Sequence, residues 1–123
     1  MKTQTPKSTT LEGIMTEFPT LCYQGARRAF KMNDDEAHAS RAELVHAPTE
    51  IAAARKWIAE NCSKRKTINR GPGSYGLKHQ IERGVGIYIS NGSCIAAFLL
   101  EGYSFNQQGI NGFFNVSMRK KAP

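Results

Sequence analysis

Residues 63–103 read SKRKTINRGPGSYGLKHQIERGVGIYISNGSCIAAFLLEGY, and the rest of the chain is organised around them. The segment begins with a run of cations at 64–66 and then passes through the helix-breaking triplet Gly71-Pro72-Gly73. It ends with the most apolar stretch of the protein, residues 94–100. Since charge and hydrophobicity are concentrated in one segment, it predicts a basic binding face supported by a buried helix.

The length and composition indicate one domain. At 123 residues the chain can bury the core of a single domain, but not the cores of two ordinary ones. Its apolar and charged fractions, 40% and 22%, are those of a globular protein and not of a disordered one. We expect a flexible tail over residues 1–10, a single globular domain over 11–118 and a basic tail over 119–123.

The sequence predicts a cytoplasmic protein. Its longest apolar run is far below the roughly 18 residues that cross a bilayer, so no membrane contact is expected. The first ten residues lack the apolar core of a signal peptide. Cys22, Cys62 and Cys94 are odd in number and widely spaced, which predicts three reduced and mostly buried thiols.

The net charge of +7 is unevenly distributed along the chain. Residues 34–50 are acidic and are offset only by Arg41. Residues 64–83 are basic and are offset only by Glu82. A basic patch of this size is compatible with nucleic acid or another polyanion. The alternative interpretation is a soluble face that happens to be cationic.

Two helices are predicted before residue 32. Apolar residues recur at three- and four-residue intervals over 11–18, which is helix spacing. Pro19 should end this helix, because it lacks a backbone donor and disfavours helix at Phe18. Residues 21–30 are then expected to form a second helix whose basic last turn suits the helix dipole.

Two further helices are predicted before the basic segment. Asn33 is followed by three acidic residues, which favours a helix start there and a helix over 37–45. Pro48 should mark the end of that helix, and Thr49 is predicted to cap the next, at 50–61. The apolar face of the second helix, with Trp57 at its border, comprises Ile51, Ala54, Ile58 and Cys62.

Residues 63–73 are interpreted as a basic linker that leads into a short helix at 74–83. Ser74 can cap this helix. Leu77 and Ile81 stand four residues apart and should both face the core. The outward face is then expected to consist of Lys78, His79, Glu82 and Arg83.

The segment that follows has two possible structures. Asn91-Gly92 between apolar residues is a strong hairpin signal. Residues 96–101 instead favour helix, and Gly102 stands where a glycine commonly follows a helix end. We favour a helix over 92–101 with Ser90 or Asn91 as its cap.

A short strand is expected at 85–89. Its predicted partner is 112–117, which has strand composition and follows a turn rich in Gly, Asn and Gln. The predicted fold class is therefore a mainly α, small single domain of the α+β type. It should contain several short helices and a minor C-terminal β element.

Motifs for catalysis or metal binding are missing from the sequence. The histidines and cysteines lack metal-ligand spacing, and no cysteine lies in a catalytic signature. We therefore expect no enzyme activity, no metal and no cofactor. The turn before Ser74 is compatible with an anion site, with Arg70 and Lys78 nearby, but an ordinary turn and cap explains it better. Tyr75 can either stack on an unpaired base or pack against the protein.

Three segments of the central region stand out: KTINR at 66–70, SYGLKH at 74–79 and YISNG at 88–92. Together with IAA at 95–97 and Gly102-Tyr103, they resemble a pattern in short uncharacterised proteins of phages and plasmids. The resemblance covers roughly residues 64–117 and carries no activity and no residue roles. It implies an accessory protein of a mobile genetic element, a class that includes inhibitors of host defence complexes.

We therefore expect a small, cytoplasmic, non-enzymatic protein that contacts nucleic acid or a nucleoprotein complex. The alternative is a phage- or plasmid-encoded inhibitor of the anti-CRISPR type, which docks on a host defence protein complex. The residues expected to make the contact are Lys64, Arg65, Lys66, Arg70, Ser74, Tyr75, Lys78 and Arg83.

Overall fold

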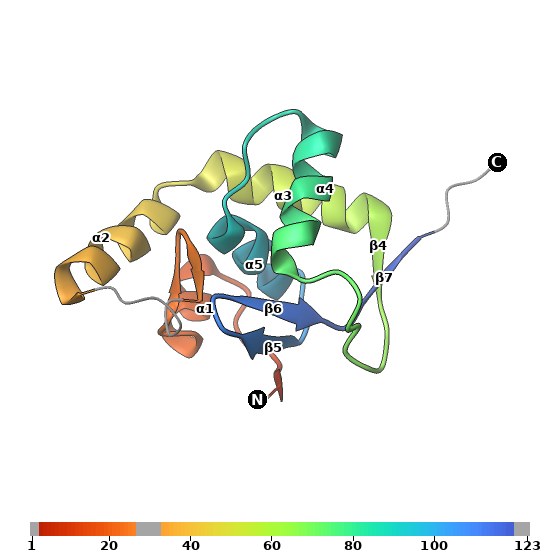
Figure 1. Cartoon of the computed structure of the whole chain (residues 1–123), viewed down its shortest axis with the longest axis horizontal. Helices are drawn as coiled ribbons and strands as arrows, with labels where there is room; N and C mark the ends of the chain where they lie inside the picture. The colour runs from red at the N-terminus through yellow and green to blue at the C-terminus, as the bar shows by residue number, and fades with distance from the viewer. Residues whose placement is uncertain (1–2, 27–32, 120–123) are drawn as a thin grey trace.

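Helix α5 (Asn91–Leu100) runs through the middle of the protein, and the other elements pack around it (Figure 1). The computed structural model describes residues 3–26 and 33–119. Every residue of α5 before Leu100 is buried. A helix without a polar face is stable only when it is covered on all sides, so its composition dictates this central place.

The described part of the chain contains four more helices, and three of them pack against α5. Helix α3 packs along it, while α4 and α1 cover other sides. Helix α2 extends to one end of the molecule, opposite the end that carries β4 and β7 (Figure 1). The bounds are α1 (Leu11–Glu17), α2 (Asp34–Val45), α3 (Pro48–Asn61) and α4 (Ser74–Val85). None of the described helices combines the length and the apolar composition that crossing a membrane requires.

The described strands form small antiparallel sheets. The largest has the order β1-β5-β6, and two further pairs are β2-β3 and β4-β7. The β4-β7 pair joins the end of α3 to the last strand, with Ser63 opposite Ser117. The bounds are β1 (Thr3–Gln4), β2 (Leu21–Cys22), β3 (Gly25–Ala26), β4 (Cys62–Lys64), β5 (Phe105–Gln108), β6 (Asn111–Phe114) and β7 (Val116–Met118). The observed class, a small α+β domain dominated by helices, agrees with the expected one.

Local capping signals placed two helix starts correctly. Asn33 accepts a hydrogen bond from the Glu36 N–H, and the Glu36 side chain accepts one from the Asn33 N–H, which is a complete capping box. Ser90 caps α5 by accepting from the Ser93 N–H at 3.0 Å. Gly102 follows the C-cap of α5 with φ of +86°, as the helix interpretation of this segment predicts.

The predicted core is confirmed, with one exception. Phe98 is fully buried and stacks on Phe114, with ring centroids 4.4 Å apart. Trp57 is only partly buried, because its indole lies over Gly84 of α4 at the surface. The other predicted core residues are all buried: Ile51, Ile58, Leu77, Ile81, Ile95 and Leu99. Cys22, Cys62 and Cys94 are free and buried, as expected.

The predicted helix over 21–30 is wrong in its described part. Residues 21–26 form the β2-β3 hairpin, and residues 27–30 lie outside the described part of the chain. The hairpin forms because its backbone bonds to distant elements: the Tyr23 N–H donates to Ser40 and the Tyr23 carbonyl accepts from Gly92. Gly25 has φ of +130°, which a helix does not allow.

Two predicted caps are also wrong. Thr49 lies inside α3, whose N-cap is Ala47 and whose first residue is Pro48. Proline suits this position because its missing N–H would have no helical partner there. Ser74 is the first residue of α4, which is capped by Gly73 without a side-chain hydrogen bond.

The strand predicted at 85–89 does not form. Val85 is the last residue of α4, and the chain then runs as an extended arm to Ser90. Carboxylates, not a neighbouring strand, accept from its backbone: Ile89 N–H donates to Glu82 and Ser90 N–H to Glu50. Residues 112–117 are divided between β6 and β7, whose partners are β5 and β4.

Both ends of the described chain are tied to the domain. Thr3–Gln4, expected in a flexible tail, pairs with β5. The backbone N–H of Arg119 donates to Asn61 at 2.8 Å, and the remaining residues of the expected basic tail lie outside the described part. The expected linker at 63–73 begins inside strand β4.

Candidate functional site

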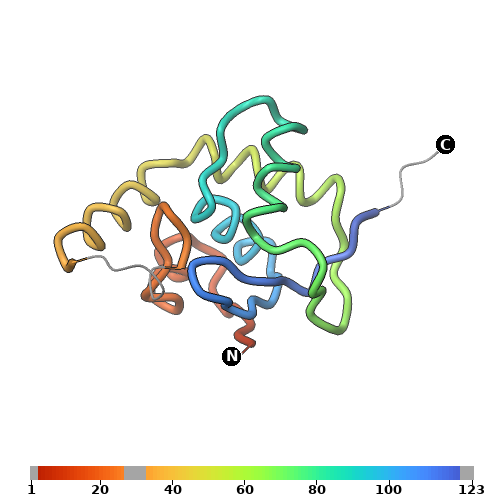
Figure 2. The backbone as a smooth tube through the Cα atoms, viewed as in Figure 1, coloured from red at the N-terminus to blue at the C-terminus, as the bar shows by residue number. Residues whose placement is uncertain are grey.

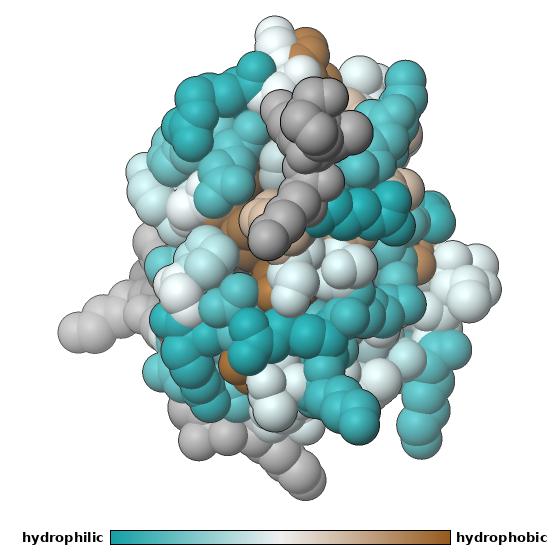
Figure 3. Space-filling view, turned by 90° about the vertical axis from the view of Figure 1, so that its right-hand side faces the viewer, coloured by the Kyte–Doolittle hydropathy of each residue, from teal (hydrophilic) through white to brown (hydrophobic). Residues whose placement is uncertain are grey.

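Exposed cations gather at the end of the molecule that carries β4 and β7. Figure 3 looks onto this side and shows hydrophilic side chains over most of it. In the described part of the chain, none of these cations has a carboxylate partner. We call this set the cationic end: Lys64, Arg65, Lys66, Arg70, Arg83 and Arg119.

The loop that carries most of these cations is fixed to the last two strands. Arg65 and Asn115 exchange two hydrogen bonds, from Arg65 N–H to the Asn115 carbonyl and from Asn115 Nδ2 to the Arg65 carbonyl. Asn69 donates from its N–H to Phe114 and from its side chain to Val116, each at 2.8 Å. The backbone is therefore held in place while the charged groups face solvent.

Neutral groups orient two of the cations. The Arg70 guanidinium donates to Asn106 Oδ1 at 2.9 Å and lies 5.5 Å from the centroid of the Phe113 ring. The Lys64 ammonium lies 5.5 Å from the centroid of the Tyr103 ring. These contacts position the charges without neutralising them, so an incoming anion has no internal carboxylate to displace.

Ser74 is not available to a partner. It is fully buried, and its hydroxyl accepts from the Gly112 N–H at 3.2 Å. Its carbonyl accepts from the Cys94 thiol. The side chain thus joins α4 to β6 and α5, which is a structural role.

Lys78 does not face outward as predicted. Its side chain is 6% exposed, and its ammonium lies 3.1 Å from Glu82 Oε2. The same ammonium lies 4.5 Å from the centroid of the Tyr88 ring and 5.6 Å from that of Tyr75. A buried charge needs such partners, because desolvation otherwise opposes it.

Glu82 organises this region. Its Oε2 accepts hydrogen bonds from both the Ile89 N–H and the Lys78 ammonium, and its Oε1 lies 2.8 Å from His79 Nδ1. Burial by itself raises the pKa of this carboxyl, but the hydrogen bonds outweigh it and hold the pKa below its usual value. Glu82 is therefore a charged anchor for both α4 and the extended arm.

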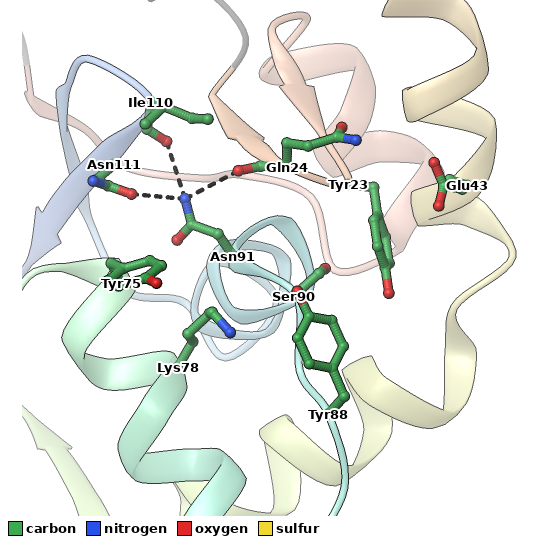
Figure 4. Close-up of a pocket in the computed structure, with 10 residues that line it drawn as sticks. All are labelled: Tyr23, Gln24, Glu43, Tyr75, Lys78, Tyr88, Ser90, Asn91, Ile110 and Asn111. Atoms are coloured by element: carbon green, nitrogen blue, oxygen red, sulfur yellow. Dashed lines mark hydrogen bonds between the residues drawn. The ribbon is translucent and has the colours of Figure 1, made fainter. Parts of the chain in front are cut away.

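Tyr75 and Lys78 line a pocket of about 570 Å³, within the usual range for ligand sites. Figure 4 shows Tyr75 and Tyr88 on either side of the Lys78 ammonium. We call this the tyrosine pocket. Its lining is Tyr23, Gln24, Glu43, Tyr75, Lys78, Tyr88, Ser90, Asn91, Ile110 and Asn111.

The pocket is assembled from segments far apart in the sequence. Figure 2 shows the β2-β3 hairpin, the start of α5 and the β5-β6 turn coming together. Ala26 N–H donates to the Ile110 carbonyl, and Gly92 N–H donates to Tyr23. Tyr23 also donates its hydroxyl to Glu50 at 2.6 Å, and burial together with this carboxylate raises the pKa of Tyr23.

Asn91 lies at the inner wall with an unsatisfied oxygen. Its Nδ2 lies 2.8–3.3 Å from three acceptors, the carbonyls of Gln24 and Ile110 and the side-chain oxygen of Asn111 (Figure 4). These acceptors fix the amide orientation, because a flipped amide would place oxygen against oxygen. Asn91 is 7% exposed, and its Oδ1 has no hydrogen-bond partner among the described residues.

No family model, curated protein or solved structure matches this chain. Function therefore has to be inferred from the cationic end and the tyrosine pocket.

Sequence reasoning placed Tyr75 and Lys78 near a binding site, but missed Tyr23, Tyr88 and Asn91. One signal in the sequence pointed to some of them. The segments SYGLKH and YISNG, singled out in the sequence, both contribute side chains to the pocket. Tyr23 has no such signal, because its place depends on the hairpin that sequence analysis did not predict.

The thiols and histidines form no further site among residues 3–26 and 33–119. That part of the chain contains no group of three or more metal-ligating side chains. Burial raises the pKa of Cys62 to about 11 and that of Cys94 further, so both thiols stay protonated at neutral pH.

Proposed function

We propose that this protein binds nucleic acid without acting as an enzyme, and that the cationic end contacts the phosphate backbone. One observation carries the proposal: six exposed cations on one side have no carboxylate partner in the described part of the chain. Such charges gain most from a polyanion, because each phosphate contact releases condensed counterions.

The distribution of charge over the whole molecule supports the same proposal. The acidic residues of α2 lie at the opposite end from β4 and β7 (Figure 1). A molecule with its charges separated in this way turns its cationic end toward an approaching polyanion. The resemblance to phage and plasmid proteins fits an accessory role on a mobile genetic element.

A second candidate is docking on a host defence protein. It is favoured by Ile87 and Tyr88, which are 40% and 61% exposed on the extended arm. An exposed tyrosine such as Tyr88 is a typical anchor of protein interfaces, and Ile87 adds apolar surface beside it. Salt separates the two candidates, because phosphate contacts weaken steeply with salt whereas a packed interface does so much less.

The test measures fluorescence anisotropy of labelled single-stranded and duplex oligonucleotides at several salt concentrations from about 50 to about 200 mM. Replacing Lys64, Arg65 and Lys66 together by alanine should weaken binding. The slope of log K against log salt should fall by about 0.7–0.9 for each phosphate that the variant no longer neutralises.

The matched control changes charge at the other end of the molecule. Asp35→Asn with Glu36→Gln alters the charge of α2 and keeps the acceptor of the capping box, so the slope should stay unchanged. The proposal fails if the folded wild-type protein binds no oligonucleotide at the lowest salt. It also fails if the triple variant binds as tightly as wild type with the same slope.

A further inference from the structure

Two tyrosines at the mouth of the pocket keep most of their surface in solvent. Tyr75 is 55% exposed and Tyr88 is 61% exposed. Both stand on rigid supports, since Tyr75 belongs to α4 and Tyr88 lies one residue before the Ile89 N–H bonded to Glu82. Exposed rings that are held in place form a stacking surface, and burying them against a flat ligand would remove apolar area from water.

The polar groups of the pocket define which hydrogen-bond donors and acceptors the edge of such a ligand should carry. Asn91 Oδ1 is a buried acceptor with no hydrogen-bond partner among the described residues, so it can accept from a donor that reaches the inner wall of the pocket. The Lys78 ammonium carries three donors, of which Glu82 takes one, so it can donate to a ligand acceptor. In Figure 4 the Asn91 oxygen points away from its three neighbouring acceptors, toward the side of Tyr75 and Lys78.

A flat ring with an N–H donor beside an acceptor is the chemistry of a nucleobase. Adenine, cytosine and guanine each carry an exocyclic amino group next to ring or carbonyl acceptors. Thymine and uracil carry a ring N–H between two carbonyls, so every common base offers a donor beside an acceptor. A duplex hides these edges, so the pocket suits an unpaired base.

The pocket lies along a path from the cationic end. Strand β6 carries Asn111 of the pocket and also Phe113, whose ring lies below the Arg70 guanidinium. Arg70 in turn precedes α4, the helix that carries Tyr75. A strand whose phosphates lie on the loop cations can pass Arg70 and place a base in the pocket.

We infer that the tyrosine pocket binds one unpaired nucleobase, so the nucleic acid held by the cationic end is single-stranded. The inference rests on the proposed function and narrows its ligand. Tyr75 and Tyr88 stack on the base, Asn91 accepts from an N–H group of the base, and Lys78 donates to a neighbouring acceptor of the base.

The test compares two single-stranded oligonucleotides of about 12 residues, a length within the site sizes of such proteins: one made of cytosine and one with the same sugars and phosphates but no bases. Wild-type protein should bind the cytosine oligonucleotide at least about fivefold more tightly, because the abasic strand has no ring to stack on the tyrosines. Replacing Tyr75 and Tyr88 together by alanine should weaken binding of the cytosine oligonucleotide about 5- to 150-fold. The salt slope should not change, since the variant keeps every cation that binds phosphate.

Tyr75→Phe with Tyr88→Phe is the matched control, because it keeps both rings and should keep wild-type affinity. Equal affinity of wild type for the two oligonucleotides, or full binding by the folded alanine variant, overturns the pocket inference and leaves the proposed function standing. Failure of wild type to bind any oligonucleotide overturns both. Salt-dependent binding of duplex at least as tight as of single strands overturns the pocket inference alone.

Discussion

The cationic end and the tyrosine pocket are built in opposite ways. Most cations of the first come from one loop, where Lys64, Arg65 and Lys66 are consecutive and exposed. The pocket collects side chains from the hairpin, α2, α4, the extended arm and the β5-β6 turn, and a buried network supports them. The cationic end needs only a backbone that holds its side chains in solvent. The tyrosine pocket forms only when the whole chain is folded. The two regions should therefore respond differently to substitution.

Gly92→Ala should have the largest effect on stability. A Cβ at Gly92 would lie 1.8 Å from the Cys22 carbonyl oxygen and 2.7 Å from that of Tyr23, so the hairpin would have to move. We expect a decrease of more than about 4 kcal/mol in the free energy of unfolding, measured by urea denaturation. Gly76→Ala is the matched control: nothing lies within 4 Å of its Cβ, and alanine should stabilise α4 by about 0.5–1 kcal/mol. A stable Gly92→Ala protein would show that the pocket wall is loosely packed.

Phe98→Ala should come next, with a decrease of about 3–5 kcal/mol in the free energy of unfolding. Phe98 is fully buried and packs between Phe114 and Tyr103, so its removal leaves a cavity under β6. Strand β6 contributes to the pocket and bonds to the cationic loop. The variant therefore measures whether the two regions depend on the same hydrophobic core. Thermal unfolding followed by circular dichroism provides the measurement. A midpoint within about two degrees of wild type would mean that α5 is not the centre of the core, since a destabilisation of this size should shift it much further.

Glu82→Gln should lower the free energy of unfolding by about 2–3 kcal/mol at neutral pH, because it weakens charged hydrogen bonds to Lys78 and to the extended arm. The pKa of Glu82 is lowered by folding. Its stabilisation is therefore present above the ordinary pKa of a glutamate and is lost as the pH falls through the lower folded value. The difference between wild type and variant should be largest near pH 7 and disappear in acid.

Melting curves across this pH range measure the effect of Glu82→Gln. Glu60→Gln is the control, since Glu60 is an exposed glutamate on α3, and it should change the melting temperature little at any pH. A Glu82→Gln difference that stays constant with pH would show that the charge of Glu82 does not support the pocket.

The smallest effect on stability is expected for the triple alanine variant of Lys64, Arg65 and Lys66. These side chains are exposed and have no carboxylate partner in the described part of the chain, so each substitution should change stability by less than about 0.5 kcal/mol. Urea denaturation of wild type and variant tests this. A destabilisation above about 2 kcal/mol would mean that the cationic loop is part of the folding core, and the distinction between the two regions would fail.

Local signals in the sequence predicted several elements correctly. The Asn33 capping box, the Ser90 cap and Gly102 each act within a few residues, so the bounds of α2 and α5 follow from nearby side chains. The apolar run of α5 also dictated its burial, because no exposed position suits a helix with that composition. The position of the cationic loop was also predictable. Its charged residues are neighbours in the sequence, so they stay close together in any fold.

Elements whose backbone bonds to distant partners were not predictable. The hairpin at 21–26 depends on Ser40 and Gly92, and the extended arm depends on Glu50 and Glu82. Composition alone favoured a helix in the first case and a strand in the second. Hydrogen bonds across the fold decided otherwise, because every buried N–H needs an acceptor wherever the acceptor lies.

By itself, the sequence determined the fold class, the central helix and the charge of one end of the protein, because each depends on composition or on neighbours a few residues away. Only the tertiary structure decided that Lys78 is buried between two tyrosines, that Ser74 is covered by β6, and that one oxygen of Asn91 has no hydrogen-bond partner among the described residues. Those outcomes depend on which distant segments meet, and packing and hydrogen bonding over the whole chain select that arrangement.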